Sequence, residues 1–166
     1  MFAALATYAG ATAGALAAVG PAALLYKARR DLRTARRALH EDELTGLANR
    51  RACHAYLDTA AGGGPIAIVL IDLDRFKSVN DRFGHEAGDH VLCHVGARLR
   101  KVRHPVGLSA RLSGDEYVLV IDDAAAAGAV THQVWDLISA VPFVIGDGQL
   151  RLTASIACGE DLRLRV

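Results

Sequence analysis

The stretch from Ile66 to Asp89 constrains the fold of this chain more than any other segment. Six consecutive apolar residues, 66–71, predict a strand that is buried on both faces. The run ends in Asp72, and a carboxylate at the end of a buried strand is costly to desolvate unless a cation meets it. A polar turn is expected next, leading into a helix and carrying Asn80, Asp81, Gly84, His85 and Asp89. This order suits a phosphate ligand held through a metal ion, but a strand followed by a solvated loop would explain the same residues.

Charge and cysteine content narrow the class of protein. The 166 residues carry 19 basic and 18 acidic side chains, a net charge of +1, so the chain lacks a basic footprint for nucleic acid. Its single tryptophan also argues against a base-stacking surface, and nucleic acid is not an expected partner. The three cysteines have no metal-ligand spacing and indicate thiols in a reducing compartment.

Residues 1–26 are predicted to form a transmembrane helix. Apart from two tyrosines they contain no ionisable side chain, and about 20 apolar residues suffice to cross a bilayer. Six lysines and arginines follow between Lys27 and Arg37, which by the positive-inside rule keeps the remainder in the cytosol. We therefore expect a single-pass protein of the inner membrane with a cytoplasmic domain. A cleaved signal peptide is the alternative, but its positive charge would precede the apolar run.

Residues 27–41 are expected to form a connecting helix. Its apolar residues follow the 3, 4, 3, 4 spacing of a short coiled-coil seam: Leu25, Ala28, Leu32, Ala35 and Leu39. A solvated basic helix near anionic lipid explains the segment equally well.

The domain from residue 42 to residue 166 is predicted to belong to the α+β class. The pattern breaks at Thr45-Gly46, and a helix restarts with Asn49 as a suitable N-cap. The elements expected after the first strand are a helix at 86–102, a hairpin of 108–112 with 116–121, a helix at 124–141 and a second hairpin of 143–145 with 150–157. This order indicates a two-layer sandwich, an antiparallel-rich sheet with helices on one face.

Carboxylates are the candidate chemistry. If the first hairpin pairs beside strand 66–71, Asp72 and Asp115 come together at one end of the sheet. Such acids repel one another, and a divalent cation relieves the repulsion. Oxygen ligands of this kind suit Mg²⁺, and a pair of such ions can bridge an attacking hydroxyl and a leaving pyrophosphate. A nuclease or phosphatase could use the same arrangement.

Three segments resemble the signature blocks of the GGDEF family, the diguanylate cyclases. They are DELTGLANRR at 42–51, DLDRFKSVNDRFGHEAGD at 72–89 and RLSGDEY at 111–117, and TASIA at 153–157 is similar to a later strand of that family. The resemblance implies a palm-like sheet related to the nucleotidyl cyclases. It also implies an enzyme of signal transduction that condenses two GTP into cyclic di-GMP and two pyrophosphates, by Mg-assisted attack of a 3′-hydroxyl on the α-phosphate. With the helix predicted over 1–26, this enzyme would be anchored in the membrane.

The resemblance also assigns roles to individual residues. It places Mg²⁺, or Mn²⁺, on Asp72, Asp115, Glu116 and the main-chain carbonyl of Leu73, and it makes Asp115 and Glu116 the catalytic acids. The residues implied to contact the substrate are Asn80 and Asp89 at the guanine, Lys77 and His85 nearby, and Gly114, which leaves room for the phosphates. Because each subunit of this family binds one GTP, a homodimer is implied.

The sequence departs from the family pattern at four places, and two of them, Ser113 and the end of the chain, motivate an alternative to the active enzyme. Ser113 stands where the family usually has its first glycine, and Tyr117 replaces a phenylalanine. Residues 104–107, HPVG, occupy the place of the product-inhibition motif, so feedback through it is expected to be absent. The family continues with a helix that carries a phosphate-gripping Lys and Arg, whereas this sequence stops after residues 161–166, which would expose one face of the sheet. The alternative is a catalytically inactive GGDEF module that binds GTP or a protein partner.

Overall fold

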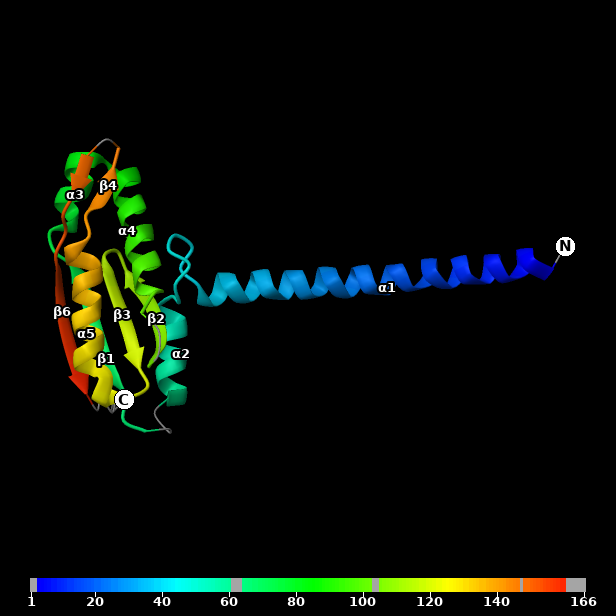
Figure 1. The fold of residues 1–166 in the computed structure, drawn as a ribbon, viewed down its shortest axis with the longest axis horizontal. Coiled ribbons are helices and arrows are strands. Elements are labelled where there is room, and N and C mark those ends of the chain that lie inside the picture. The colour runs from blue at the N-terminus through cyan, green and yellow to red at the C-terminus, as the bar shows by residue number, and fades with distance from the viewer. Residues whose placement is uncertain (1–2, 61–63, 103–104, 147, 161–166) are drawn as a thin grey trace. The chain divides into compact units, whose positions relative to one another are not determined.

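The computed structural model describes residues 3–60, 64–102, 105–146 and 148–160, and it divides into two compact units, residues 1–39 and residues 40–166. The first unit is helix α1, which runs from Ala3 to His40 and contains Pro21 (Figure 1). From residue 20 to residue 39 every side chain of α1 is exposed. Within the described residues, no helix has both the length and the apolar character that crossing a bilayer requires, so the transmembrane helix expected over 1–26 is not supported there.

The second unit is built on a four-stranded sheet of order β2-β3-β1-β6 in which every neighbouring pair is antiparallel (Figure 1). The strands are β1 (Ala67–Leu73), β2 (Val106–Ser113), β3 (Glu116–Ile121) and β6 (Ala154–Glu160). The strand predicted over 66–71 is confirmed as β1, although Leu70 is 46% exposed and not buried as expected. The first hairpin is confirmed because β2 pairs with β3. The antiparallel-rich α+β class is confirmed as well.

The two faces of the sheet are covered differently. Alternate residues of β1, such as Val69 and Ile71, pack in the main core against α4 (His85–Leu99) and α5 (Ala127–Trp135). Ile68, pointing to the opposite face, joins a smaller cluster with Cys53 of α2 (Arg50–Ala60). The expectation that all helices lie on one face was therefore wrong, because the outward-facing apolar residues of β1 and β3 also need a cover.

The polar stretch after β1 is helical rather than a turn. Residues Phe76–Phe83 form α3, with Phe76 and Val79 buried, and Gly84 at φ +84° separates α3 from α4. Asn80 and Asp81 thus lie on a helix, which corrects the expected loop. The apolar residues three and four positions apart outweigh the polar ones between them because they face the core.

The end of the domain also differs from the prediction. Strand β4 (Phe143–Ile145) pairs with β5 (Gly148–Leu150) in a separate two-stranded sheet, whereas β6 pairs with β1. The expected second hairpin is confirmed at Phe143 and Leu150, but its second strand does not continue to residue 157. Residues from Ala154 onward instead form β6, because the open edge of β1 requires backbone partners. The expected helix over 124–141 consists of η1 (Ala124–Ala126), α5 and a π-helical turn η2 (Asp136–Ala140).

Two further expectations concern the start of α2 and residues outside the described ranges. The predicted N-cap of α2 is confirmed, because the Asn49 side-chain oxygen accepts a hydrogen bond from the Ala52 amide at 3.0 Å. The expectations about residues 161–166, and about residue 104 of the HPVG segment, lie outside the described residues.

Candidate functional site

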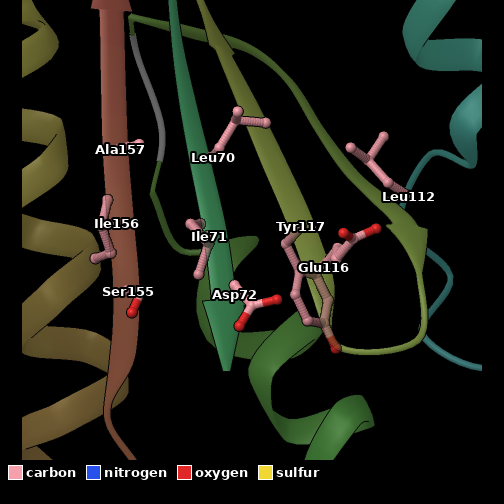
Figure 2. Close-up of a pocket in the computed structure, with 9 residues that line it drawn as sticks. All are labelled: Leu70, Ile71, Asp72, Leu112, Glu116, Tyr117, Ser155, Ile156 and Ala157. Atoms are coloured by element: carbon pink, nitrogen blue, oxygen red, sulfur yellow. The ribbon is translucent and has the colours of Figure 1, made fainter. Parts of the chain in front are cut away.

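The sheet brings acidic residues from two signature segments to one end. Asp72 is the register partner of Glu116 across the β1–β3 pair, and the Leu73 amide lies 3.4 Å from the carbonyl oxygen of Asp115. Asp72 and Glu116 line a cavity of about 350 Å³ whose other walls are largely apolar, including Leu70 (Figure 2). Asp72 and Asp115 are therefore neighbours, as pairing of the hairpin beside β1 predicted, and Glu116 lies next to them.

Repulsion among these acids shapes their electrostatics. Desolvation raises the pKa of Asp72, and the negative charges of Asp115, Glu116 and Asp74 raise it further. A raised carboxyl pKa means that the folded protein disfavours the negative charge at this position. A bound cation would relieve this penalty.

Asp74 is already engaged within the fold. Its carboxylate accepts hydrogen bonds from the Thr153 hydroxyl at 2.5 Å and from the Ser155 hydroxyl at 2.7 Å, and these bonds lower its pKa. Its amide donates to the Thr153 carbonyl at 2.9 Å. Asp74 thus fastens the end of β1 to β6, which leaves Asp72 as the acid of β1 that faces the cavity.

Glu116 has two partners of its own. The Ser113 hydroxyl donates a hydrogen bond to Glu116 Oε2 at 2.5 Å, and Arg50 Nη2 lies 3.8 Å from the same oxygen. The Arg50 Nε–H donates to the carbonyl of Leu112 at 3.3 Å, which ties its guanidinium to the hairpin.

The turn between β2 and β3 is held by Arg111. The Arg111 Nε–H donates to the Gly114 carbonyl at 2.8 Å, and its Nη1 lies 3.1 Å from Asp42 Oδ1. Gly114 has φ +45°, a conformation that favours glycine, and a Cβ added there would meet no heavy atom within 4 Å. The turn therefore leaves open space beside Asp115.

The remaining predicted substrate residues form a second group on α3 and α4. Asn80 Oδ1 is buried without a hydrogen-bond partner and packs so closely on Gly88 that a Cβ at Gly88 would lie 1.9 Å from it. The other members of the group are exposed: Lys77, His85 and Asp89. A buried acceptor without a donor is energetically costly, so Asn80 Oδ1 is an unsatisfied group at the contact between α3 and α4.

The structure does not join the two groups. In the part of the chain that it describes, no hydrogen bond links Lys77, Asn80, His85 or Asp89 to the acids of the sheet. A second cavity, of about 670 Å³, is lined by Asp72 and Asp74, by Arg75, which precedes α3, and on α3 by Ser78, Val79, Arg82 and Phe83.

The donor set at the sheet end fits a hard divalent cation. No three side chains of His, Cys, Asp or Glu converge as a metal cluster among the described residues. The carboxylates of Asp72 and Asp115 and the main-chain carbonyl of Leu73 are nevertheless oxygen donors of the kind that Mg²⁺ binds. They suffice because this ion keeps several waters and completes its shell from phosphates.

Three contacts at the site were not anticipated from the sequence. Arg50 and Arg111 lie inside the signature segments, but the sequence predicts no role for either. Their partners lie 62 and 69 positions away, a separation at which local patterns carry no signal. The Tyr117 hydroxyl donates to the Leu92 carbonyl at 3.1 Å, so this buried residue has a hydrogen-bond partner.

Together these features define an α+β domain with an acidic site at one end of an antiparallel sheet. Residues 39–161 match the family model described as "Diguanylate cyclase, GGDEF domain". The chain belongs to the GGDEF family.

Named relatives and a solved structure agree with this assignment. The response regulator PleD of Caulobacter vibrioides is 37% identical over 125 residues, which cover 71% of this chain and 28% of PleD. The diguanylate cyclase TpbB of Pseudomonas aeruginosa is 38% identical over 117 residues, covering 66% and 27%. The coiled coil and GGDEF domain of DgcB from Caulobacter crescentus, solved in complex with c-di-GMP, gives a TM-score of 0.74 at 27% identity, covering 86% of this chain and 80% of that one. The match thus spans little more than a quarter of these two curated relatives.

Proposed function

We propose that this domain condenses two molecules of GTP into cyclic di-GMP and releases two pyrophosphates. The observation that carries the proposal is the register of β1 and β3, which sets Asp72 opposite Glu116 with Asp115 in the adjoining turn. Membership of the GGDEF family and relatives named diguanylate cyclases support the same reaction.

A divalent cation, Mg²⁺ or Mn²⁺, would be held by Asp72, Asp115 and the Leu73 carbonyl. When bound, it supplies Lewis-acid stabilisation of phosphate charge. The chain itself positions the two acids. Pairing of β1 with β3 fixes Asp72, and the hydrogen bond from Arg111 to the Gly114 carbonyl fixes the turn that carries Asp115.

The α3–α4 group would read the base. The unsatisfied Asn80 Oδ1 and the exposed Asp89 carboxylate are acceptors, which suits the N–H donors along the edge of guanine. Lys77 and His85 would lie near the substrate, and the open space at Gly114 would admit its phosphates.

The proposal is tested by incubating the purified full chain with GTP and Mg²⁺ and separating the nucleotides by liquid chromatography with mass detection. We expect cyclic di-GMP from the wild type and at least about 10²-fold less from Asp115→Asn, because that change removes a metal-binding charge. A wild-type chain that is folded by circular dichroism and binds GTP but forms no product would contradict cyclase activity.

A second candidate is an inactive module that binds GTP or a protein partner. The Ser113–Glu116 hydrogen bond favours it, because it occupies one of the acids implied in catalysis. GTP binding without turnover, together with partner binding that Asp115→Asn leaves intact, would support this reading.

The active form of the cyclase is proposed to be a homodimer. A single site holds one GTP, and the α1 seam residues Leu25 and Leu32 are 60% and 69% exposed in the single chain. Pairing of two α1 helices would bury this seam and bring two GTP-loaded domains together.

Location at the inner membrane also remains a proposal, supported by the basic residues that follow residues 1–26. Fractionation of cells that express the full chain tests it. Recovery of the chain in the supernatant after ultracentrifugation would contradict the proposal, and a variant lacking residues 1–26 serves as the reference for a soluble domain.

A further inference from the structure

The carboxylate of Glu116 is held on one side by a pair of donors. Ser113 Oγ and Arg50 Nη2 both approach the same oxygen, Oε2, at 2.5 and 3.8 Å. The Arg50 guanidinium is anchored by its bond to Leu112, so it does not need to be ordered anew for this contact. Together the two donors form what we call the Glu116 clamp.

The clamp acts where a charge conflict exists. Register partners on antiparallel strands have Cβ atoms about 5 Å apart, and like charges placed directly opposite destabilise the pair. Asp72 and Glu116 are such partners, and both face the same cavity (Figure 2). Holding Glu116 toward Ser113 and Arg50 keeps its Oε2 from joining the Asp72 carboxylate.

The two donors do not contribute equally. The side chains of Arg50 and Glu116 are 57% and 50% exposed, and an exposed ion pair at this distance is strongly screened by solvent. A hydrogen bond from a hydroxyl to a carboxylate is charge-assisted and directional. Ser113 is therefore the principal member of the clamp.

We propose that Ser113, assisted by Arg50, is a positioning residue that withholds Glu116 from the cation at Asp72 and thereby weakens cation binding in this domain. The proposal rests on the metal site of the proposed function. In this proposal Glu116 is not a permanent ligand of the cation, and its orientation toward Ser113 sets how strongly the site binds the cation.

The test measures Mn²⁺ affinity of the full chain by the loss of the free-ion electron paramagnetic resonance signal, which requires no turnover. We expect Ser113→Ala to bind Mn²⁺ about three- to tenfold more tightly than the wild type, because a released carboxylate adds its charge to the site. Ser113→Thr keeps the hydroxyl and should match the wild type. Arg50→Gln should give a smaller gain that disappears at high salt.

A double-mutant cycle keeps the interpretation specific. In a Glu116→Gln background, Ser113→Ala should leave Mn²⁺ affinity unchanged, since the group that it releases no longer carries charge. Unchanged or weaker Mn²⁺ binding by Ser113→Ala, or a gain that persists with Glu116→Gln, overturns the clamp while leaving the cyclase proposal intact. Failure of all variants to bind Mn²⁺ overturns both the clamp and the metal site. Melting curves confirm that each variant is folded.

Discussion

At the scale of single residues, the end of β1 is governed by which acid is satisfied and which is not. Asp74 accepts two hydroxyl hydrogen bonds, so the fold favours its charge. Asp72 has no such donor among the described residues and faces three other acids. Two carboxylates separated by one residue therefore differ in environment: Asp74 joins the ends of two strands through hydrogen bonds, whereas the fold disfavours the charge of Asp72.

We predict that Asp72→Asn stabilises the cation-free domain at neutral pH. The folded-state pKa of Asp72 is raised, so its charge opposes folding above that pKa, and the penalty disappears as the pH falls and the folded protein takes up the proton. The melting temperature should rise by about 1–3 °C at pH 7. The gain should shrink below about pH 4. Asp81→Asn, at an exposed acid on α3, is the matched control, and equal gains from both variants would contradict the explanation.

At the scale of elements, the segment 42–51 is hydrogen-bonded to the β2–β3 hairpin. Ala48 donates to Ser109 and accepts from Arg111 through backbone bonds of 3.2 and 2.9 Å, which adds one residue to the edge of β2. Asp42 adds a side-chain contact to the hairpin, because its Oδ1 accepts a hydrogen bond from Arg111 Nη1. The Nε–H of the same arginine donates to the Gly114 carbonyl. The turn that carries Asp115 is thus held in place by Asp42, at the amino-terminal end of the domain, acting through Arg111.

Asp42→Asn should weaken this joint at neutral pH. Burial pushes the pKa of Asp42 upward, but hydrogen bonds from Thr45 and Arg111 outweigh it and lower the pKa overall. The stabilisation is therefore present above the unfolded pKa of about 4 and is lost as the pH falls through the lower folded-state value. We expect a loss of about 1–3 kcal/mol at pH 7, measured by urea unfolding. A loss that is just as large at pH 3 would show that charge is not its cause.

Arg98 caps the carboxyl end of the helical segment that contains α5 and η2. Its guanidinium donates to the carbonyls of Leu137, Val141 and Pro142 at 3.0, 2.7 and 3.0 Å and lies 3.7 Å from the centre of the Phe143 ring. Carbonyls at a helix end lack partners within the helix, so a cation there satisfies them.

Removing this cap should be costly. We expect Arg98→Met to lower the free energy of unfolding by about 2–4 kcal/mol, because it leaves several partly buried carbonyls without a donor. Lys101→Met, at an exposed position just after α4, should change it by less than about 0.5 kcal/mol. Similar effects from the two variants, measured by chemical denaturation, would exclude the capping role.

At the scale of the whole molecule, the proposed reaction needs two domains, and α1 is the element that can pair them. We predict that Leu32→Asp makes the chain monomeric at micromolar concentration, because a charge in a short seam cannot be desolvated. Sedimentation velocity measures the change, and cyclic di-GMP formation should fall with the dimer. Thr34→Asp, off the seam, should remain dimeric; if it dissociates as well, the seam assignment is wrong.

Local patterns predicted much of the fold. The apolar run of β1, the boundaries of β3 and the Asn49 cap could be inferred because neighbouring residues alone encode periodicity and capping. The helix α3 was not predicted, because the polar residues between its apolar positions favour a turn. The pairing of β6 with β1 was missed because the competition for an open strand edge is not visible in either segment.

The candidate site divides in the same way. The sequence by itself determined which acids stand at the ends of strands and which family the chain resembles, since both depend on short, ordered segments. Only the tertiary structure decided that α2 covers the second face of the sheet and that the Asp74 carboxylate accepts a hydrogen bond from Thr153, just before β6. It also decided that Ser113 and Arg50 contact Glu116. The physical reason is that these outcomes depend on strand register and on side chains brought together across the chain, which hydrophobic burial and hydrogen-bond satisfaction settle only when the whole domain is packed.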